Sequence, residues 1–210
     1  MNEDYYFNIK KKRPEEIYDK VSDYFYGERL DSYATSKNIQ RIQLKITKRA
    51  LEIIQLQKEH ALILDAGCGP GFASFYIKNI GYQVVAFDII KDFLFYYDIK
   101  DINPIVGDMC FPPFKPESFD AIVSISALQW IYRDIENKIM THAFSELISS
   151  FYKILKFGSK AIFQFYPKNN TILEHMRIII NEKSDFDGGF IIDNPDNPRK
   201  RRIFLILEKK

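Results

Sequence analysis

A glycine-rich turn between two apolar segments constrains the fold of this chain more than any other feature. Residues 62–66 are apolar up to an acid at Asp65, and residues 83–88 are apolar up to a second acid at Asp88. The apolar positions between them have helical spacing, and the turn itself contains Gly67, Gly69 and Gly71. Parallel α/β sheets bind nucleotide-like ligands at such turns. We therefore predict an α/β fold with a ligand site here, although a tight turn in any α/β protein has the same outline.

The spacing of the glycines indicates which ligand binds. Dinucleotide folds use G-x-G-x-x-G, whose helix N-terminus faces a pyrophosphate. This chain has D-x-G-x-G-x-G, and the carboxylate of Asp65 would repel a pyrophosphate but suits a cationic amine or sulfonium. Asp88 ends the second strand, where an acid accepts hydrogen bonds from ribose hydroxyls. These features favour S-adenosylmethionine as the cofactor.

Composition limits the class of protein. The chain has 210 residues, of which 46% are hydrophobic and 15% aromatic, which fits one folded α/β domain. No apolar run approaches the ~20 residues of a membrane span, and the polar start lacks the apolar core of a secretory signal. Two cysteines and three scattered histidines form no disulfide or zinc pattern. We expect an intracellular protein with no membrane segment and no metal.

Positive charge is gathered in short runs, although the formal net charge is only +2. Residues 10–13 read KKKR and residues 199–202 read RKRR. Such runs are usually solvated, but two of them give a modest indication of a nucleic-acid surface. The candidates for RNA binding are Arg199, Lys200, Arg201 and Arg202.

The order of the predicted elements defines the fold class. Helices are expected at residues 15–26, 37–56 (with Ser36 as N-cap), 71–79, 91–98, 136–155 and 171–181. Strands are expected at residues 62–66, 83–88, 103–107, 121–126, 160–166, 189–192 and 203–207. The last two strands are joined without a helix, so they form a hairpin. This pattern predicts the class I methyltransferase Rossmann-like fold, a mostly parallel seven-stranded sheet with a terminal antiparallel hairpin strand. We divide the chain into an N-terminal helical lid, residues 1–58, and a methyltransferase domain, residues 59–210.

Other candidate site residues follow predicted strands. We expect Asp108 to accept a hydrogen bond from the adenine amino group and Met109 to pack on the ring, although a strand-ending Asp commonly caps a turn. Trp130 is a candidate for stacking on a substrate base or for the core, and Tyr166 for an opposing aromatic wall or an ordinary turn. The expected cofactor set is Asp65, Ala66, Gly67, Gly69, Gly71, Asp88, Ile89, Gly107, Asp108, Met109 and Ser124.

Five motifs carry a resemblance to a known family: LDAGCGPG, GDM, SISALQW, FQFYPKN and GGFIIDNP. Together they resemble the eukaryotic small-subunit (18S) rRNA guanine-N7 methyltransferases, from about Gln43 to the last strand. The resemblance implies that Asp65, Gly67, Asp88, Asp108 and Met109 hold the cofactor and that the region of Tyr33 and Ser36 forms part of a lid. The chain departs from the family in a longer segment between Tyr18 and Tyr33, in Lys37 and Asn38 where an arginine is usual, and in ending at Lys210 before the family's basic tail.

The resemblance also implies partners and a location. The family works with a small zinc-binding activator subunit, which docks by β-augmentation at the third strand, and acts in the nucleus or nucleolus and in the cytoplasm. Ile105 and Val106 on that strand, and the aromatic residues 93 and 95–97 before it, suggest an apolar edge suited to a partner. The alternative is that the longer N-terminal segment folds over this surface.

We therefore interpret the chain as an S-adenosylmethionine-dependent methyltransferase that modifies N7 of a guanine in small-subunit rRNA during ribosome biogenesis. N7 has a free lone pair at neutral pH, so the reaction needs positioning and water exclusion rather than a general base. Trp130 and Tyr166 are positioning candidates. Two alternatives stay open: a small-molecule methyltransferase of the same fold, and a cofactor-binding ribosome-assembly factor with a mainly structural role.

Overall fold

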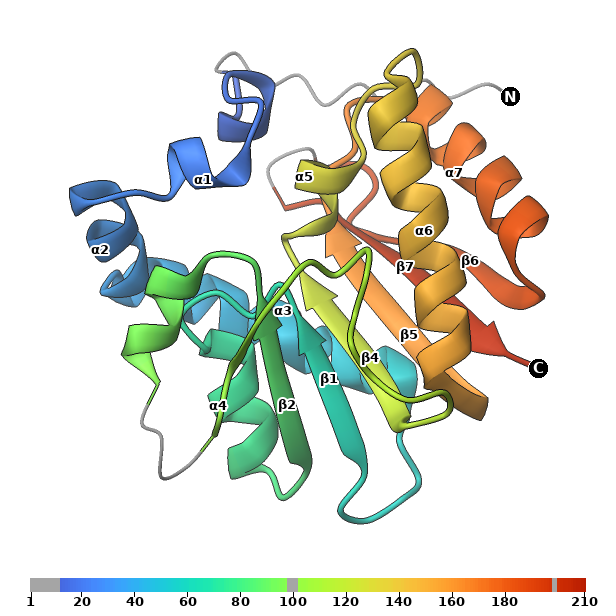
Figure 1. Cartoon of the computed structure of the whole chain (residues 1–210), viewed down its shortest axis with the longest axis horizontal. Coiled ribbons are helices and arrows are strands. Elements are labelled where there is room, and N and C mark those ends of the chain that lie inside the picture. Colours follow the sequence, from blue (N-terminus) through green and yellow to red (C-terminus); the bar gives the residue numbers. More distant parts are fainter. Residues whose placement is uncertain (1–11, 98–101, 198–199) are drawn as a thin grey trace.

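The computed structural model describes residues 12–97, 102–197 and 200–210. Its centre is a seven-stranded sheet with the order β3-β2-β1-β4-β5-β7-β6 (Figure 1). The strands are β1 (Leu62–Ala66), β2 (Gln83–Asp88), β3 (Ile105–Val106), β4 (Phe119–Ile125), β5 (Leu155–Phe165), β6 (Phe186–Asp193) and β7 (Arg202–Lys209). The helices are α1 (Val21–Tyr24), α2 (Glu28–Ala34), α3 (Lys37–Ile54), α4 (Phe72–Asn79), α5 (Leu128–Ile131), α6 (Lys138–Ile154) and α7 (Asn170–Lys183), with 3-10 turns η1 (Pro14–Glu16) and η2 (Lys91–Tyr96).

The direction of the strands confirms the predicted class of fold. The first five strands in chain order are parallel to one another, and β7 pairs antiparallel with both β5 and β6. The predicted terminal hairpin is therefore present. Phe165, at the carboxyl end of β5, lies beside Ile203 near the start of β7, so the loop between β6 and β7 lies at the carboxyl edge of the parallel strands.

Helices cover both faces of the sheet, which explains why the central strands are apolar throughout. Ile63 on β1 packs in a core cluster with α3 and α4, whereas the adjacent Leu64 packs in a cluster with α6 and α7. Successive side chains of a strand point to opposite faces, so a strand covered on both sides needs apolar residues at every position. Because Ile46 and Ala50 of α3 belong to the core of the sheet, the predicted division at residue 58 falls inside one packed unit.

The helix N-caps follow the sequence rules. The Ser36 hydroxyl accepts a hydrogen bond from the Ile39 N–H at 3.3 Å, so the predicted cap of α3 is confirmed. Asn137 and Asn169 act in the same way at the starts of α6 and α7. Each side-chain oxygen satisfies a backbone N–H that the helix itself leaves unpaired.

Three predicted elements are wrong in length or type. The helix predicted for residues 15–26 is instead η1 followed by α1, and Gly27, with a φ of 53°, separates this segment from α2. The helix predicted from residue 91 is the 3-10 turn η2 over its described part, and β3 has 2 residues rather than the predicted five or so. These segments are shaped by the surfaces on which they pack, and such tertiary contacts override local propensity.

Within the described ranges, no helix is long and apolar enough to cross a membrane. Nor do the described residues bring three His, Cys, Asp or Glu side chains into an arrangement that could hold a metal ion.

Candidate cofactor site

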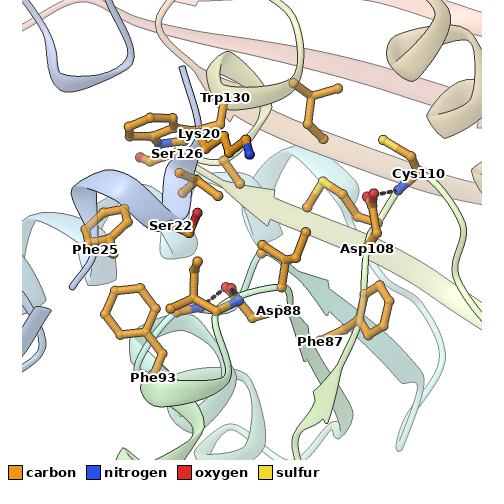
Figure 2. Close-up of a pocket in the computed structure, with 18 of the residues that line it drawn as sticks. Lys20, Ser22, Phe25, Phe87, Asp88, Phe93, Asp108, Cys110, Ser126 and Trp130 are labelled. Atoms are coloured by element: carbon orange, nitrogen blue, oxygen red, sulfur yellow. Dashed lines mark hydrogen bonds between the residues drawn. The ribbon is translucent and has the colours of Figure 1, made fainter. Parts of the chain in front are cut away.

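A cavity of about 470 Å³ lies at the carboxyl ends of the parallel strands (Figure 2). Open α/β sheets bind ligands at this edge. Its floor comes from the turns after β1, β2, β3 and β4, and its roof from the N-terminal segment around Lys20, Ser22 and Phe25. Of the expected cofactor residues, those that line it are Gly67, Gly69, Asp88, Ile89, Gly107, Asp108 and Met109.

The glycine turn after β1 has the backbone shape that only glycine accommodates easily. Gly67 has a φ of 75°, and a Cβ atom there would lie 2.5 Å from the Cβ of Ala127. Gly69 has a φ of 53°, and a Cβ atom there would meet nothing within 4 Å. Gly67 thus permits close packing of the turn on β4, whereas Gly69 leaves open space for a ligand to approach the backbone.

Asp88 joins the second strand to the glycine turn. Its Oδ2 accepts a hydrogen bond from the Gly69 N–H at 2.7 Å, and its Oδ1 accepts one from the Ile90 N–H at 2.8 Å. Burial raises the pKa of this carboxyl, and the N–H groups of Ile90 and Gly69 oppose the rise. Each carboxylate oxygen can accept a second hydrogen bond, so Asp88 remains able to bind a ribose hydroxyl.

Asp65 lies beneath the turn rather than in the cavity. Its side chain is buried, and it accepts a hydrogen bond from the Ser74 hydroxyl, which also contacts Tyr97. Burial raises the pKa of Asp65 to about 7, against the opposing hydrogen bond from Ser74. The expectation that this carboxylate faces the cationic end of the cofactor does not match its position. Ala66 and Gly71 also lie outside the cavity lining.

The turn after β3 supplies the adenine end of the expected site. The exposed Asp108 accepts a hydrogen bond from the Cys110 N–H at 2.9 Å through Oδ1, and its carboxylate retains the capacity to accept further hydrogen bonds. Met109 is buried, and its Cε lies close to Gly67. Both side chains therefore line the cavity as expected, and Asp108 also caps its own turn.

Aromatic side chains from the N-terminal segment form the roof. The Phe25 ring lies 5.0 Å from Phe93, 5.0 Å from Tyr33 and 6.1 Å from Trp130, centroid to centroid. Trp130 is half-buried, lines the cavity and packs on the roof (Figure 2), and its stacking on a substrate base stays a prediction. Burial raises the pKa of Tyr33 to about 12, which keeps its hydroxyl neutral. The predicted lid, residues 1–58, includes Lys20, Ser22 and Phe25, but the sequence analysis did not single them out as cavity residues; their aromatic neighbours were the available signal.

Ser126, rather than the expected Ser124, faces the site. Ser124 is fully buried, whereas Ser126 lines the cavity with a φ of 59°. The Ser126 hydroxyl donates to Gln164 Oε1 at 2.8 Å and accepts from Gln43 Nε2 at 3.4 Å. Ser124 lies within β4, where side chains on both faces of the sheet are covered by helices. Ser126 is the first residue after the strand, and it is therefore the one that reaches the cavity.

A second cavity of about 480 Å³ adjoins the first. Asp19 and Met140 line both cavities. Tyr166 lines the second cavity rather than the first, so it does not face Trp130 across the cofactor site as expected. Arg13 holds Tyr166 by donating from Nη1 to its carbonyl oxygen at 2.6 Å, with the guanidinium 5.2 Å from the ring centroid.

The basic loop between β6 and β7 contains residues with different surroundings. Lys200 is exposed, but Arg201 is only 7% exposed, and its guanidinium donates to the Pro195 carbonyl oxygen from Nε at 2.9 Å and from Nη2. The charged group of Arg201 is therefore directed into the loop, which disfavours the predicted contact with RNA, and that contact stays a prediction. Arg202 is half-buried and donates to the Arg201 carbonyl oxygen, and Arg199 lies outside the described residues.

The fold and the cofactor cavity together define a class I S-adenosylmethionine-dependent methyltransferase. A family described as a methyltransferase domain matches residues 64–163. The structure is similar to that of a Haemonchus contortus phosphoethanolamine N-methyltransferase solved with S-adenosylhomocysteine (TM-score 0.64, 18% identity, 86% of this chain and 57% of that one). It is also similar to a Haloferax volcanii methyltransferase solved with the Trm112 activator (TM-score 0.62, 15% identity, 88% of this chain and 100% of that one). At these identities the similarity shows the fold.

Curated relatives define the family. The chain is 30% identical to the 18S rRNA (guanine-N(7))-methyltransferase bud23 of Schizosaccharomyces pombe, over 93% of this chain and 74% of that protein. It is 32% identical to the 18S rRNA (guanine(1575)-N(7))-methyltransferase of Saccharomyces cerevisiae, over 93% of this chain and 72% of that protein. The chain belongs to the 18S rRNA (guanine-N(7))-methyltransferase family.

Proposed function

We propose that this chain transfers a methyl group from S-adenosylmethionine to N7 of a guanine in small-subunit rRNA, during ribosome biogenesis in the nucleus or nucleolus. The observation that carries the proposal is the pair of adjoining cavities at the carboxyl edge of the sheet, which share Asp19 and Met140. One has the acids and glycines suited to the cofactor, and the other has room for an acceptor base. The relatives' substrate supplies the identity of that base.

The cavity fits the cofactor on its own geometry. The open space at Gly69 and the carboxylate of Asp88 suit a ribose, and Asp108 with Met109 suits an adenine. The bound cofactor supplies a methyl group on a sulfonium. Three carboxylates on the lining, those of Asp19, Asp88 and Asp108, also favour a cationic ligand over a pyrophosphate.

The protein's own contribution to the transfer is positioning. Guanine N7 carries an unprotonated lone pair, so attack on the methyl group requires alignment and exclusion of water rather than proton removal. Trp130 and Phe25 form an apolar roof over the cofactor cavity. Ser126, held by Gln164 and Gln43, fixes part of the wall of the cofactor cavity.

RNA would approach at the same edge of the sheet. The exposed Lys200 and the half-buried Arg202 belong to the loop that leaves β6 and enters β7 at this edge. We propose Lys200, Arg202 and Arg199 as phosphate contacts, because cations that neutralise RNA phosphates bind through release of counterions.

We also propose that a small zinc-binding activator subunit docks on β3. Ile105 and Val106 are 36% and 56% exposed, and Phe95 beside them is 81% exposed. An open strand with exposed apolar neighbours is suited to β-augmentation. The N-terminal segment covers Phe93 and bonds to Tyr96 through Asp31, so it accounts for part of the predicted aromatic patch and leaves Phe95 uncovered.

Mapping N7-methylguanosine in small-subunit rRNA tests the proposal. Precursor subunits from cells that lack the protein are incubated with the purified chain, the activator subunit and S-adenosylmethionine. We expect methylation of one guanine, abolished when S-adenosylhomocysteine is added in excess. Binding of S-adenosylhomocysteine without methylation of rRNA would refute the proposed acceptor but not the cofactor.

A further inference from the structure

The second cavity contains a buried carboxylate that the cofactor site does not use. Glu15, on the turn η1, lines this cavity and is only 6% exposed. Its Oε1 lies 3.9 Å from Arg13 Nη1, which is an ion-pair distance rather than a hydrogen bond. Glu15 does not line the cofactor cavity. Its position therefore needs an explanation of its own.

A buried carboxylate requires donors. Burial raises the pKa of Glu15, and its own backbone N–H, Arg13 and Arg133 oppose the rise. An ionised carboxylate has about four acceptor positions on its two oxygens, and burying a charge is unfavourable unless it is paired and hydrogen-bonded. The carboxylate is therefore suited to a ligand that brings N–H donors into the cavity.

Two hydrogen bonds made by Arg13 hold the turn that carries Glu15 in place. Arg13 donates from Nη1 to the Tyr166 carbonyl oxygen at 2.6 Å, and the Arg13 backbone N–H donates to Glu16 Oε2 at 2.8 Å. Glu16 therefore serves as the capping residue, while its neighbour Glu15 is directed inward. A carboxylate on such an anchored turn can select a ligand, because little ordering is needed when the ligand binds.

Guanine matches this arrangement among the nucleobases. Its Watson–Crick edge carries two adjacent donors, N1–H and the N2 amino group, which one carboxylate accepts together, and beside them the acceptor O6. Arg13 and Arg133 line the same cavity, and their positive charge favours an acceptor such as O6. Enzymes that act on a single base commonly identify it through this edge while aromatic side chains pack on the ring, and Tyr166 lies on the same wall.

The orientation also fits the reaction. N7 belongs to the five-membered ring of guanine, at the end away from N1 and the N2 amino group. A base whose Watson–Crick edge meets Glu15 in the second cavity therefore turns N7 toward the adjoining cofactor cavity, past the shared Asp19 and Met140. Building on the proposed function, we propose that Glu15 accepts hydrogen bonds from N1–H and the N2 amino group of the target guanine and so selects guanine at the second cavity.

The test compares GMP with IMP, which lacks the N2 amino group. Binding of each nucleotide to the full chain loaded with S-adenosylhomocysteine is titrated for the wild type, Glu15→Gln and Glu28→Gln. Glu28 is an exposed residue on α2 that lines neither cavity. We expect the wild type and Glu28→Gln to prefer GMP by on the order of tenfold, since one hydrogen bond to a charged group is lost with IMP. Glu15→Gln should bind the two nucleotides about equally.

The affinity for S-adenosylhomocysteine reports on folding, because Glu15 lies outside the cofactor cavity. It should be equal in all three proteins. Equal binding of GMP and IMP by the wild type, or failure of both to bind, would overturn the inference without any variant. A preference for GMP that survives in Glu15→Gln would do the same. A preference that depends on Glu15, in a protein that methylates no rRNA, would support the inference and refute the proposed acceptor.

Discussion

The carboxylate of Asp88 accepts a hydrogen bond from the Gly69 N–H, with 2.7 Å between Oδ2 and the nitrogen. The acid at the end of β2 and the glycine turn after β1 are therefore one unit, and each holds the other in position. A second bond, from the Ile90 N–H, fixes the other oxygen. A ligand that binds both parts meets a surface that is already ordered, which reduces the entropy lost on binding.

Replacing this acid should weaken binding of the cofactor. We expect Asp88→Asn to reduce the affinity for S-adenosylhomocysteine by roughly 1.5–3 kcal/mol, because the ribose hydroxyls lose a charged acceptor. Calorimetric titration measures the change. Glu59→Ala, an exposed acid before β1 that lines no part of the cavity, is the control and should bind as the wild type does. Tight binding of NAD and no heat with S-adenosylhomocysteine would contradict the assignment of the site.

Asp65 should make stability depend on pH. Its pKa is raised from 3.8 to about 7, chiefly by burial, so the folded state favours the protonated form. Its contribution to stability is full below the unfolded pKa of about 4 and is lost as the pH rises through about 7. The unfolding free energy of Asp65→Asn, minus that of the wild type, should therefore increase as the pH rises from about 4 to about 7, by on the order of a few kcal/mol. Urea titrations across this range measure it, and a difference independent of pH would contradict the prediction.

Asp120 should make stability depend on pH in the opposite direction, and it therefore serves as a control. Burial acts to raise its pKa, but hydrogen bonds from Lys156, the Leu62 N–H and Lys58 prevail and lower it to about 2. Its contribution is present above the unfolded pKa of about 4 and is lost as the pH falls through about 2. Asp120→Asn should thus be destabilised most at neutral pH, where Asp65→Asn gains most.

The central strands could be predicted because they are covered on both faces and are therefore apolar along most of their length. Asp88 could be placed because it ends an apolar strand, and Asp108 because it closely follows the short apolar strand β3. The same property hides which residue beyond a strand reaches the ligand, so Ser124 was predicted where Ser126 lines the cavity. Composition alone cannot tell that one arginine of a basic run, Arg201, turns inward to the Pro195 carbonyl oxygen.

The N-terminal segment was hard to predict for another reason. Residues 15–26 are rich in aromatic and charged side chains, and their shape depends on the surfaces of Phe93, Trp130 and Tyr166, which are distant in sequence. Local propensity favours one helix, whereas tertiary contacts favour short turns that carry Phe25 and Glu15 to two different cavities. Such packing overrides propensity.

Two neighbouring residues of the basic loop should behave differently. Lys200→Ala should weaken RNA binding and lower its salt slope by roughly 0.7–0.9, the loss of one phosphate contact, with stability unchanged. Arg201→Ala should instead reduce the unfolding free energy by about 1–3 kcal/mol, because the carbonyl oxygen of the half-buried Pro195 loses a charged donor. Filter binding at several salt concentrations and urea unfolding separate the two effects. An Arg201→Ala protein with unchanged stability and a reduced salt slope would instead support the prediction that Arg201 binds RNA.

The edge at β3 should determine whether the chain associates with an activator subunit. Phe95 is 81% exposed and Val106 is 56% exposed beside an open strand of 2 residues, so Phe95→Ser with Val106→Glu should disturb the fold little. It should weaken the one-to-one complex with the zinc-binding subunit by tenfold or more, since apolar contacts at an interface are lost and a charge is buried. Co-expression followed by size-exclusion chromatography measures the complex. Ile178→Ser, on α7, which packs against α6 and β6 rather than near β3, and 48% exposed, is the matched control and should leave the complex intact. A chain that is monomeric and fully active with or without the zinc protein would refute this assignment.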